Sequence, residues 1–166
     1  MNIYPKTIKL YPFARKEFSF NGLISFDEFD KLSSIIGKQA GNVECGFSLY
    51  LKDEKIPVIK GFVSAKVFVE CQRCLNKMPQ KLHSNFLIAF VDEQQEIGLD
   101  KTIDTLNFQE ELFVIDFLTD ELLLNLPMIT KHDDNCNIEY EKMNLKTLDK
   151  EEKKENPFNI LKSLKK

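Results

Sequence analysis

The sequence has no tryptophan and no apolar run of about 18 residues or more. A helix that crosses a bilayer needs about 20 predominantly apolar residues, so a membrane-spanning helix is excluded and no membrane partner is expected. The first residues, MNIYPKTIKLYPFARKEF, also lack the charged, apolar and small-residue regions of a secretory signal. We therefore expect a cytoplasmic protein, in which cysteines stay reduced.

Catalytic signatures are also scarce. The chain has two histidines, His83 and His132, and it shows no serine–histidine–aspartate order, glycine-rich phosphate loop or metalloprotease helix. His83 falls in a predicted strand, where a half-exposed structural role is more common than a role as a base. We expect no catalytic residues and interpret the chain as a non-enzymatic protein.

The chain also lacks the overall positive charge that is usual in proteins that bind nucleic acid over a broad face, since its net charge is -3. Proteins that bind nucleic acid over a broad face are usually basic. Any contact with RNA must therefore be local, and no DNA partner is expected. The negative charge is concentrated in residues 92–121, where ten acidic residues accompany a single lysine, a net charge of -9. Such a charge run is typical of a solvated face.

What the chain does have is enough length and apolar content for one folded domain. Its 166 residues are 43% hydrophobic and include 14 phenylalanines, a composition typical of a globular domain. The stretch ISFDEFDKLSSIIG predicts a helix over residues 26–36. Ser25 and Glu28 are expected to form a capping box at its start, and Gly37 to end it.

Alternating apolar and polar residues predict three strands, at 44–51, 58–71 and 82–91. The short connections between them favour an antiparallel meander. Residues 92–110 are expected to form a solvated loop with room for one short strand, and ELFVIDFLTDELLLNLP predicts a strand that runs into a helix capped by Asp116. The fold class that follows is α+β, with an antiparallel β-sheet core, a few short helices and a flexible C-terminal tail.

Three segments are expected along the chain: a single α+β domain at 1–136, a charged flexible linker at 137–155 and a short amphipathic helix at 156–166. The linker combines little apolar bulk with many charges. In the terminal helix, Asn156 can act as the cap and Pro157 suits the first position. The apolar face of this helix, expected to dock on the domain itself or on a partner, consists of Phe158, Leu161 and Leu164. We expect a monomer.

Four cysteines raise the question of a metal site. Cys71 and Cys74 form a Cys-x-x-Cys pair between the second and third predicted strands, and His132 and Cys136 follow the last predicted helix. Zinc takes four such ligands in a tetrahedron, and Cys-x-x-Cys supplies two of them from one tight turn. Zinc is therefore the expected cofactor if a metal is bound. The alternative is that the cysteines are small core or loop residues, as expected for Cys45; a thioredoxin-like redox pair is less favoured, because that motif begins a helix.

Cations interleaved with aromatic residues mark a local candidate for RNA contact. In the predicted strand 58–71, Lys60 and Lys66 share a face with Phe62 and Phe68. This combination can hold phosphates and stack on unpaired bases. The alternative is a solvated sheet face against which the lysine stems pack. The candidates for nucleic-acid contact are Lys60, Lys66, Arg73, Lys77 and Lys81.

An ordered set of motifs gives the chain a family resemblance. VECGFSLYL, AKVFVECQRCLNKMPQKL, IDFLTDELLLNLPMITKHDDNC and NPFNILKSL follow one another from about residue 43 to the end. Together they resemble the YceD family, described as large ribosomal RNA subunit accumulation proteins. The resemblance implies that Cys71 and Cys74 match the family's first cysteine pair, and that Cys136 matches a cysteine after the Leu-Pro segment. Many relatives have a second Cys-x-x-Cys there, where this chain keeps only His132 and Cys136.

The resemblance also implies a function, that of a non-enzymatic ribosome-biogenesis factor that supports the synthesis, processing or stability of 23S ribosomal RNA. The expected partners are ribosomal RNA or assembly proteins of the large subunit. Residue chemistry alone leaves an alternative, a protein-interaction adaptor. In that alternative the acidic segment binds a basic large-subunit ribosomal protein, and the terminal helix docks in a groove.

Overall fold

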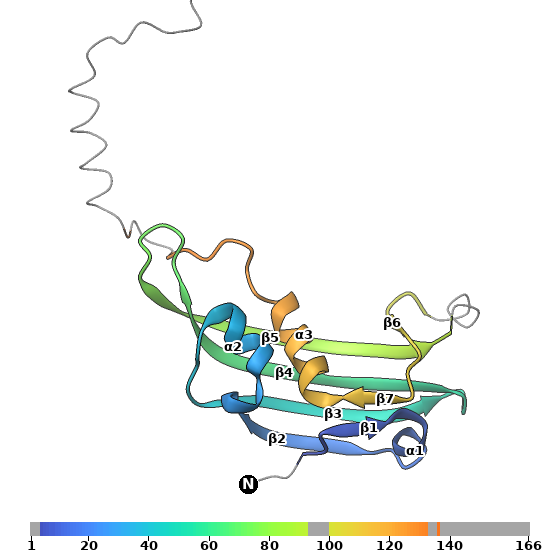
Figure 1. Cartoon of the computed structure of the whole chain (residues 1–166). Helices are drawn as coiled ribbons and strands as arrows, with labels where there is room; N and C mark the ends of the chain where they lie inside the picture. Colours follow the sequence, from blue (N-terminus) through green and yellow to red (C-terminus); the bar gives the residue numbers. More distant parts are fainter. Residues whose placement is uncertain (1–3, 93–99, 133–135, 137–166) are drawn as a thin grey trace, which may run out of the picture.

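Most of the predicted elements are present in the computed structural model, which describes residues 4–92, 100–132 and 136 (Figure 1). The predicted linker and terminal helix lie outside these residues. In chain order the described elements are β1 (Thr7–Lys9), α1 (Leu10–Ala14), β2 (Ser19–Ser25), the 3-10 helix η1 (Phe26–Glu28), α2 (Asp30–Ile36), β3 (Asn42–Lys52), β4 (Ile56–Glu70), β5 (Lys77–Val91), β6 (Asp104–Asn107), β7 (Glu111–Phe113) and α3 (Val114–Leu124).

The central sheet has five strands in the order β2-β3-β4-β5-β6. Strands β2 to β5 form an antiparallel meander, and β6, the short strand expected within residues 92–110, pairs with β5 in parallel. Strands β4 and β5 are each 15 residues long, so the hairpin that they form is the longest in the described part of the chain. The predicted α+β class is therefore confirmed. A separate two-stranded sheet joins β1 to β7, and the sequence predicted neither β1 nor β2.

The hydrophobic core lies on one face of the central sheet, the face that carries the helices and the β1–β7 sheet (Figure 1). The alternation along β4 explains this, because Val63, Val67 and Val69 are buried while Lys66 and Phe68 between them are exposed. On the other face, only a small apolar cluster around Val58 near β6 is buried in the described residues. The rest of that face has no described helix over it.

The predicted first helix is wrong in its first turn. The structure has η1 there, and α2 begins only after Phe29. Side chains three apart eclipse one another in a 3-10 helix, so Phe26 and Phe29 both enter the core, where they are 2% and 0% exposed. Ser25 caps η1 through its side-chain oxygen. Glu28 does not complete the capping box, because its carboxylate accepts a hydrogen bond from the Tyr4 hydroxyl at 2.9 Å.

The predicted cap of α3 is also wrong. The helix begins at Val114, directly after β7, and Asp116 lies inside its first turn. The backbone N–H of Val114 donates to the Lys6 carbonyl at 3.1 Å. A side-chain cap normally satisfies one of these free N–H groups at a helix start, and here the chain before β1 takes that place.

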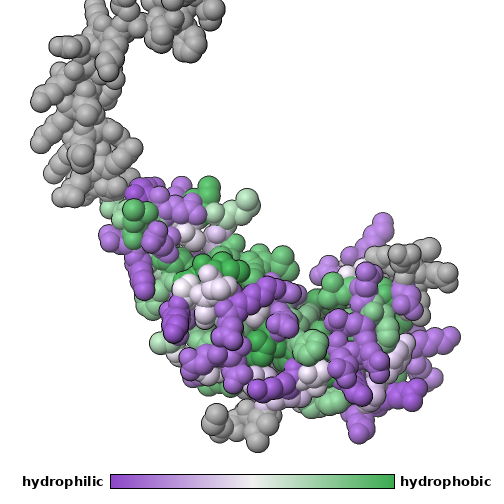
Figure 2. All heavy atoms as spheres, viewed as in Figure 1, coloured by the Kyte–Doolittle hydropathy of each residue, from purple (hydrophilic) through white to green (hydrophobic). Residues whose placement is uncertain are grey.

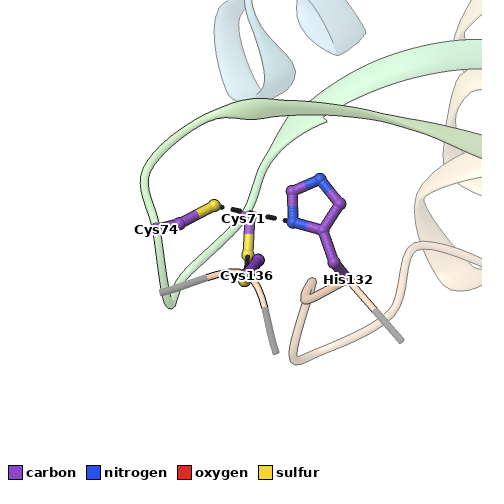
Figure 3. Close-up of side chains that lie close together, drawn as sticks. All are labelled: Cys71, Cys74, His132 and Cys136. Atoms are coloured by element: carbon purple, nitrogen blue, oxygen red, sulfur yellow. Dashed lines mark hydrogen bonds between the residues drawn. The ribbon is translucent and has the colours of Figure 1, made fainter. Parts of the chain in front are cut away.

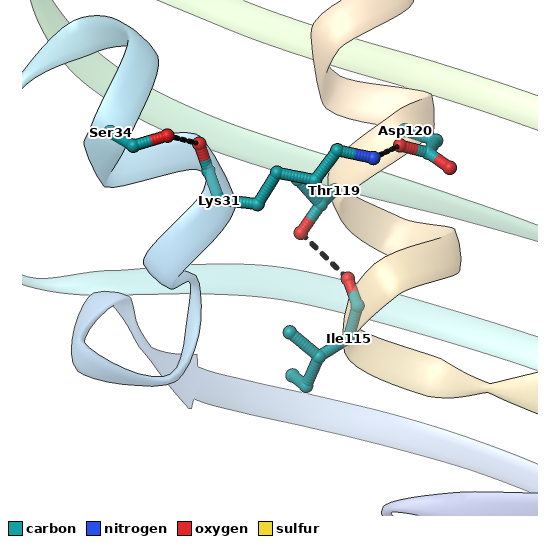
Figure 4. A network of polar contacts seen from close by, with 5 residues as sticks. All are labelled: Lys31, Ser34, Ile115, Thr119 and Asp120. Atoms are coloured by element: carbon teal, nitrogen blue, oxygen red, sulfur yellow. Dashed lines mark hydrogen bonds and ion pairs between the residues drawn. The ribbon is translucent and has the colours of Figure 1, made fainter.

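Helices α2 and α3 lie side by side over the sheet (Figure 4). The Lys31 ammonium on α2 donates a hydrogen bond to the Asp120 carboxylate on α3, and this bond together with the negative charge of Asp120 raises the pKa of Lys31. Within α3, the Thr119 hydroxyl donates to the Ile115 carbonyl at 2.7 Å. Among the residues that the structure describes, no helix is long and apolar enough to cross a membrane.

Candidate functional site

The turn between β4 and β5 presents the first two predicted metal ligands, Cys71 and Cys74. Backbone hydrogen bonds fold it tightly: the Cys71 N–H donates to the Asn76 carbonyl at 2.9 Å, and the Leu75 N–H donates to the Cys71 carbonyl at 2.8 Å. Leu75 has a positive φ of 60°, which lets the chain reverse within a few residues. Both sulfurs therefore come from one short turn and point toward the same space (Figure 3).

Two residues outside the ligand set bring the second pair of ligands to this turn. The Gln72 N–H donates to the Thr130 carbonyl at 2.8 Å, and the Gln72 side chain donates to the Met128 carbonyl at 3.3 Å. The Thr130 hydroxyl donates to the Glu70 carbonyl at 2.6 Å. The segment after α3 is thereby fixed to the end of β4. This contact places His132 beside the cysteine turn, although 58 residues separate it from Cys74.

All four predicted ligands come together (Figure 3). The donor atoms of Cys71, Cys74, His132 and Cys136 all lie within 4.8 Å of one another. The two sulfurs of Cys71 and Cys136 are 3.7 Å apart, and the Cys74 sulfur is 3.5 Å from Nδ1 of His132. Cys45, in contrast, is fully buried in the core on β3, as predicted, and burial together with the charge of Glu44 raises the pKa of its thiol to about 11.

These separations fit the ligands of one tetrahedral zinc ion. Two sulfurs that are each about 2.3 Å from zinc lie about 3.8 Å apart at the tetrahedral angle, and a sulfur and an imidazole nitrogen lie about 3.6 Å apart. A disulfide would instead hold two sulfurs at about 2.0 Å. Four protein ligands leave no open position for a substrate, as is typical of structural zinc sites. The arrangement is therefore able to hold a metal that ties the β4–β5 turn to the segment after α3.

The protonation states of the thiols also favour a cation at this place. Burial opposes ionisation of Cys71, but hydrogen bonds from the backbone N–H groups of Cys74, Arg73 and His132, and from the Cys74 side chain, outweigh it and lower the pKa of Cys71 from 9.0 to about 5. Burial raises the pKa of Cys136, and the hydrogen bonds and charges of Cys74 and Cys71 raise it further. The surroundings of Cys71 thus favour its ionised form, while those of Cys136 disfavour a second thiolate, and a bound cation would stabilise both.

The five predicted RNA-contact residues are all exposed, but they do not form one cluster. Lys66 on β4 lies directly opposite Lys81 on β5, and Lys77 lies opposite Glu70. Lys60 is on the same face of β4, six residues and therefore about 20 Å away from Lys66. Arg73 belongs to the cysteine turn. The strongest local concentration of positive charge on this face is the Lys66–Lys81 pair.

Aromatic side chains on the same uncovered face lie on both sides of this pair. The ring of Phe62 is 6.4 Å from the ring of His83 on β5, with an angle of 31° between their planes. Gly46 on β3 leaves room for the Phe62 ring, since a Cβ there would lie 2.7 Å from its Cε1. Phe68 is 56% exposed, and the Gln39 amide bonds both its backbone N–H, at 2.7 Å, and its carbonyl, at 3.0 Å. This stretch of β4 is therefore held in place where β3 no longer pairs with it.

Two open grooves adjoin Phe62, with volumes of about 560 and 530 Å³. Asn21 and Ser48 line the first groove, Asn85 and Asp104 line the second, and Lys60 lines both. Both grooves thus offer hydrogen-bonding groups beside an aromatic ring. Because Asp104 belongs to the acidic segment and lies at the Lys60 end, phosphate groups are favoured at the Lys66–Lys81 end instead.

The residues that position these groups could not be predicted from the sequence. Gln72, Thr130 and Gln39 act through hydrogen bonds to backbone groups that are distant in the sequence, and Gly46 acts by having no side chain. The ligand residues could be found because their chemistry and spacing are distinctive. The positioning residues have no comparable signature, since polar residues in turns and a glycine in a strand are common in any domain.

Comparisons with known proteins agree with the motifs. A family-wide sequence model described as "Large ribosomal RNA subunit accumulation protein YceD" matches residues 59–165, which include most of β4, all of β5 and all four candidate ligands. A curated protein with the same name from Haemophilus influenzae is 28% identical over 166 residues, covering 97% of this chain and 95% of the relative. No solved structure matches the chain significantly.

Proposed function

The chain belongs to the YceD family, and on that premise we propose that it is a non-enzymatic, cytoplasmic factor that supports accumulation of 23S ribosomal RNA by binding unpaired segments of that RNA. The family's description supports a role in accumulation of large-subunit ribosomal RNA. Direct RNA contact is the finer part of the proposal, and it rests on the uncovered face of β4 and β5.

One observation carries the RNA proposal: Lys66 and Lys81 lie directly opposite each other on a face where Phe62 and Phe68 are also accessible. Two lysines in this arrangement repel each other, and a phosphate between them would relieve the repulsion. Aromatic rings on either side can stack on bases that are not already paired. Double-stranded RNA is recognised across its wide groove by shape, so the compact combination of rings and charge favours unpaired RNA.

We also propose that the four ligands hold a structural zinc ion. The S–S and S–N separations support this, as does the thiolate character of Cys71. Zinc would fix the tip of the β4–β5 hairpin, which carries Arg73 and ends next to Lys77. Its role would be to keep this end of the RNA-binding face rigid, and no chemical step is assigned to it.

The test is ultraviolet crosslinking in cells that express the full chain, followed by sequencing of the attached RNA. Fragments of large-subunit ribosomal RNA or its precursors are expected. The variant Phe62→Ala/Phe68→Ala should lose most of this signal, because stacking on an aromatic ring contributes about 1–3 kcal/mol per base.

Leu23→Ala is the matched control, since Leu23 is 57% exposed on the edge strand β2 and its loss should leave crosslinking intact. Recovery of a basic ribosomal protein without RNA would refute RNA binding and support the adaptor hypothesis.

A further inference from the structure

An open apolar groove lies on the helix side of the sheet, near the cysteine turn, and has a volume of about 680 Å³. Its walls come from α2, the end of β4, the C-terminal end of α3 and the segment after it, and its lining includes Ile35, Val69, Leu123, Leu126 and Met128. Figure 2 shows hydrophobic residues exposed around the C-terminal end of α3 on this side. The groove is on the opposite face of the sheet from Lys66 and Phe68, so it is distinct from the proposed RNA site.

Several side chains around the groove are much more exposed than core residues of their type. Met128 and Ile35, which line the groove, are 95% and 55% exposed, and Leu124, the neighbour in sequence of the lining residue Leu123, is 79% exposed. Contiguous apolar surface of this kind usually marks a binding site. The walls are held at a set separation, because the Lys31–Asp120 bond joins α2 to α3 (Figure 4), and Gln72 and Thr130 join the following segment to β4.

We propose that this groove binds the C-terminal segment of the same chain, residues 156–166, as a short helix whose Phe158, Leu161 and Leu164 insert between α2 and the segment after α3. An amphipathic helix in an apolar groove is a common mode of recognition, with anchors spaced three or four residues apart. The segment has this spacing, with Asn156 and Pro157 suited to begin the helix.

The position of Cys136 makes this occupant the natural one. Its sulfur is 3.7 Å from that of Cys71, and the next residue along from Cys71, Gln72, lines the groove. Twenty residues, 137–156, connect Cys136 to Pro157, and a flexible chain of that length spans about 25 Å on average. A short flexible tether raises the effective concentration of its end to the millimolar range. Even a weakly binding helix would therefore occupy a groove at this distance.

The charges of the segment and the groove are also compatible. Glu70 is the charged residue among those that line the groove. The segment has three lysines, Lys162, Lys165 and Lys166, and no acidic residue. These lysines lie toward the C-terminal end of the proposed helix, where positive charge is favourable. An isolated helix of this length is marginal in water, so its helical form would depend on docking.

Methyl NMR spectra of the full chain and of the variant Phe158→Ser/Leu161→Ser test the proposal. Removing the two anchors should shift the methyl signals of Ile35, Val69 and Leu123, because the rings and methyl groups that cover them leave. The signals of Val58 and Leu87, on the other face of the sheet, should not move. Met128→Asp, at a position that is 95% exposed and so tolerant of substitution, should produce similar shifts at Ile35 and Leu123 from the groove side.

The matched control is Leu145→Ser/Leu148→Ser, which removes two leucines from the predicted linker and should leave the groove signals unchanged. Two results would overturn the proposal: groove signals that are the same with and without the anchors, and shifts that disappear on dilution, since the occupant would then be a second copy of the chain. Neither result bears on RNA binding, which uses the other face, so failure here can be told apart from failure of the proposed function.

Discussion

Replacing Lys66 and Lys81 with glutamine should stabilise the isolated protein while weakening its binding to RNA. The two lysines are directly opposite each other on neighbouring antiparallel strands, where like charges are destabilising. Glutamine keeps much of each stem and removes both charges. A pair that has a solely structural role would not be expected to show these two effects with opposite signs.

The size of each effect follows from the pairing. A cross-strand pair changes stability by roughly 0.2–1 kcal/mol, so the melting temperature should rise by about 0.4–4 °C for a chain of this size. Each phosphate contact on single-stranded RNA contributes about -0.7 to the slope of log affinity against log salt. Losing two contacts should flatten the slope by about 1.4, which corresponds to roughly 25-fold weaker binding at about 0.1 M salt.

Fluorescence anisotropy with a labelled single-stranded fragment of 23S ribosomal RNA, from about 50 to 200 mM salt, measures the slope, and calorimetry measures the melting temperature. Lys16→Gln/Lys55→Gln is the control, because it changes the net charge equally at two exposed positions outside this face. Equal flattening in both double variants would mean that binding follows net charge alone. An unchanged slope in Lys66→Gln/Lys81→Gln would show that RNA does not contact the pair, and the reasoning would fail.

Three other predictions concern the metal centre and the sheet. Elemental analysis should find about one zinc per chain in the wild type and in Cys45→Ala but none in Cys71→Ser, and equal zinc in the two variants would contradict the proposed ligand set. The wild type should also release zinc as the pH falls, because protons compete for the thiolates. Thr130→Val should weaken zinc binding about 10- to 100-fold in a chelator competition assay, because the hydroxyl that fixes the second ligand pair is lost, and an unchanged affinity would mean that this bond does not position the ligands. Gly61→Ala should lower the free energy of unfolding by about 1–3 kcal/mol, since its Cβ would lie 2.3 Å from the Gly46 carbonyl oxygen. Gly46→Ala should lower it less, because its Cβ meets the movable edge of the Phe62 ring. Denaturant titrations that gave equal losses for the two variants would refute this difference.

The sheet could be predicted because its signal is local. The alternation through Val63, Val67 and Val69 is enough to define a strand with one buried face. Strand β2 was missed because Asn21 and Gly22 interrupt its pattern, and its pairing with β3 supplies the order that its own residues do not specify. The start of the first helix was misplaced because Glu28 bonds to Tyr4, 24 residues away, and no local pattern reports such a contact.

In the candidate metal site, too, local sequence predicted some features and contacts between distant residues decided the others. Residue type and spacing identified Cys71, Cys74, His132 and Cys136 as one set, because few residue types bind zinc and they recur at characteristic spacings. The sequence could not establish that the two halves meet, since that depends on how α3 packs and on the bonds of Gln72 and Thr130. In the same way, a period of two put Lys60 and Lys66 on one face, but only the register of β4 against β5 set Lys81 opposite Lys66.

The position of the cysteine pair at the tip of the β4–β5 hairpin has a consequence for the order of folding. A hairpin joins neighbouring segments, so it closes with a smaller loss of chain entropy than contacts between distant segments. Cys71 and Cys74 are thus available early, whereas His132 and Cys136 arrive only when α3 has packed and the chain after it has bonded to the end of β4. An immature chain would hold zinc by two donors and exchange it quickly, and slow exchange would begin only with the completed domain. The exchange rate of the metal during synthesis would therefore report how far folding has progressed.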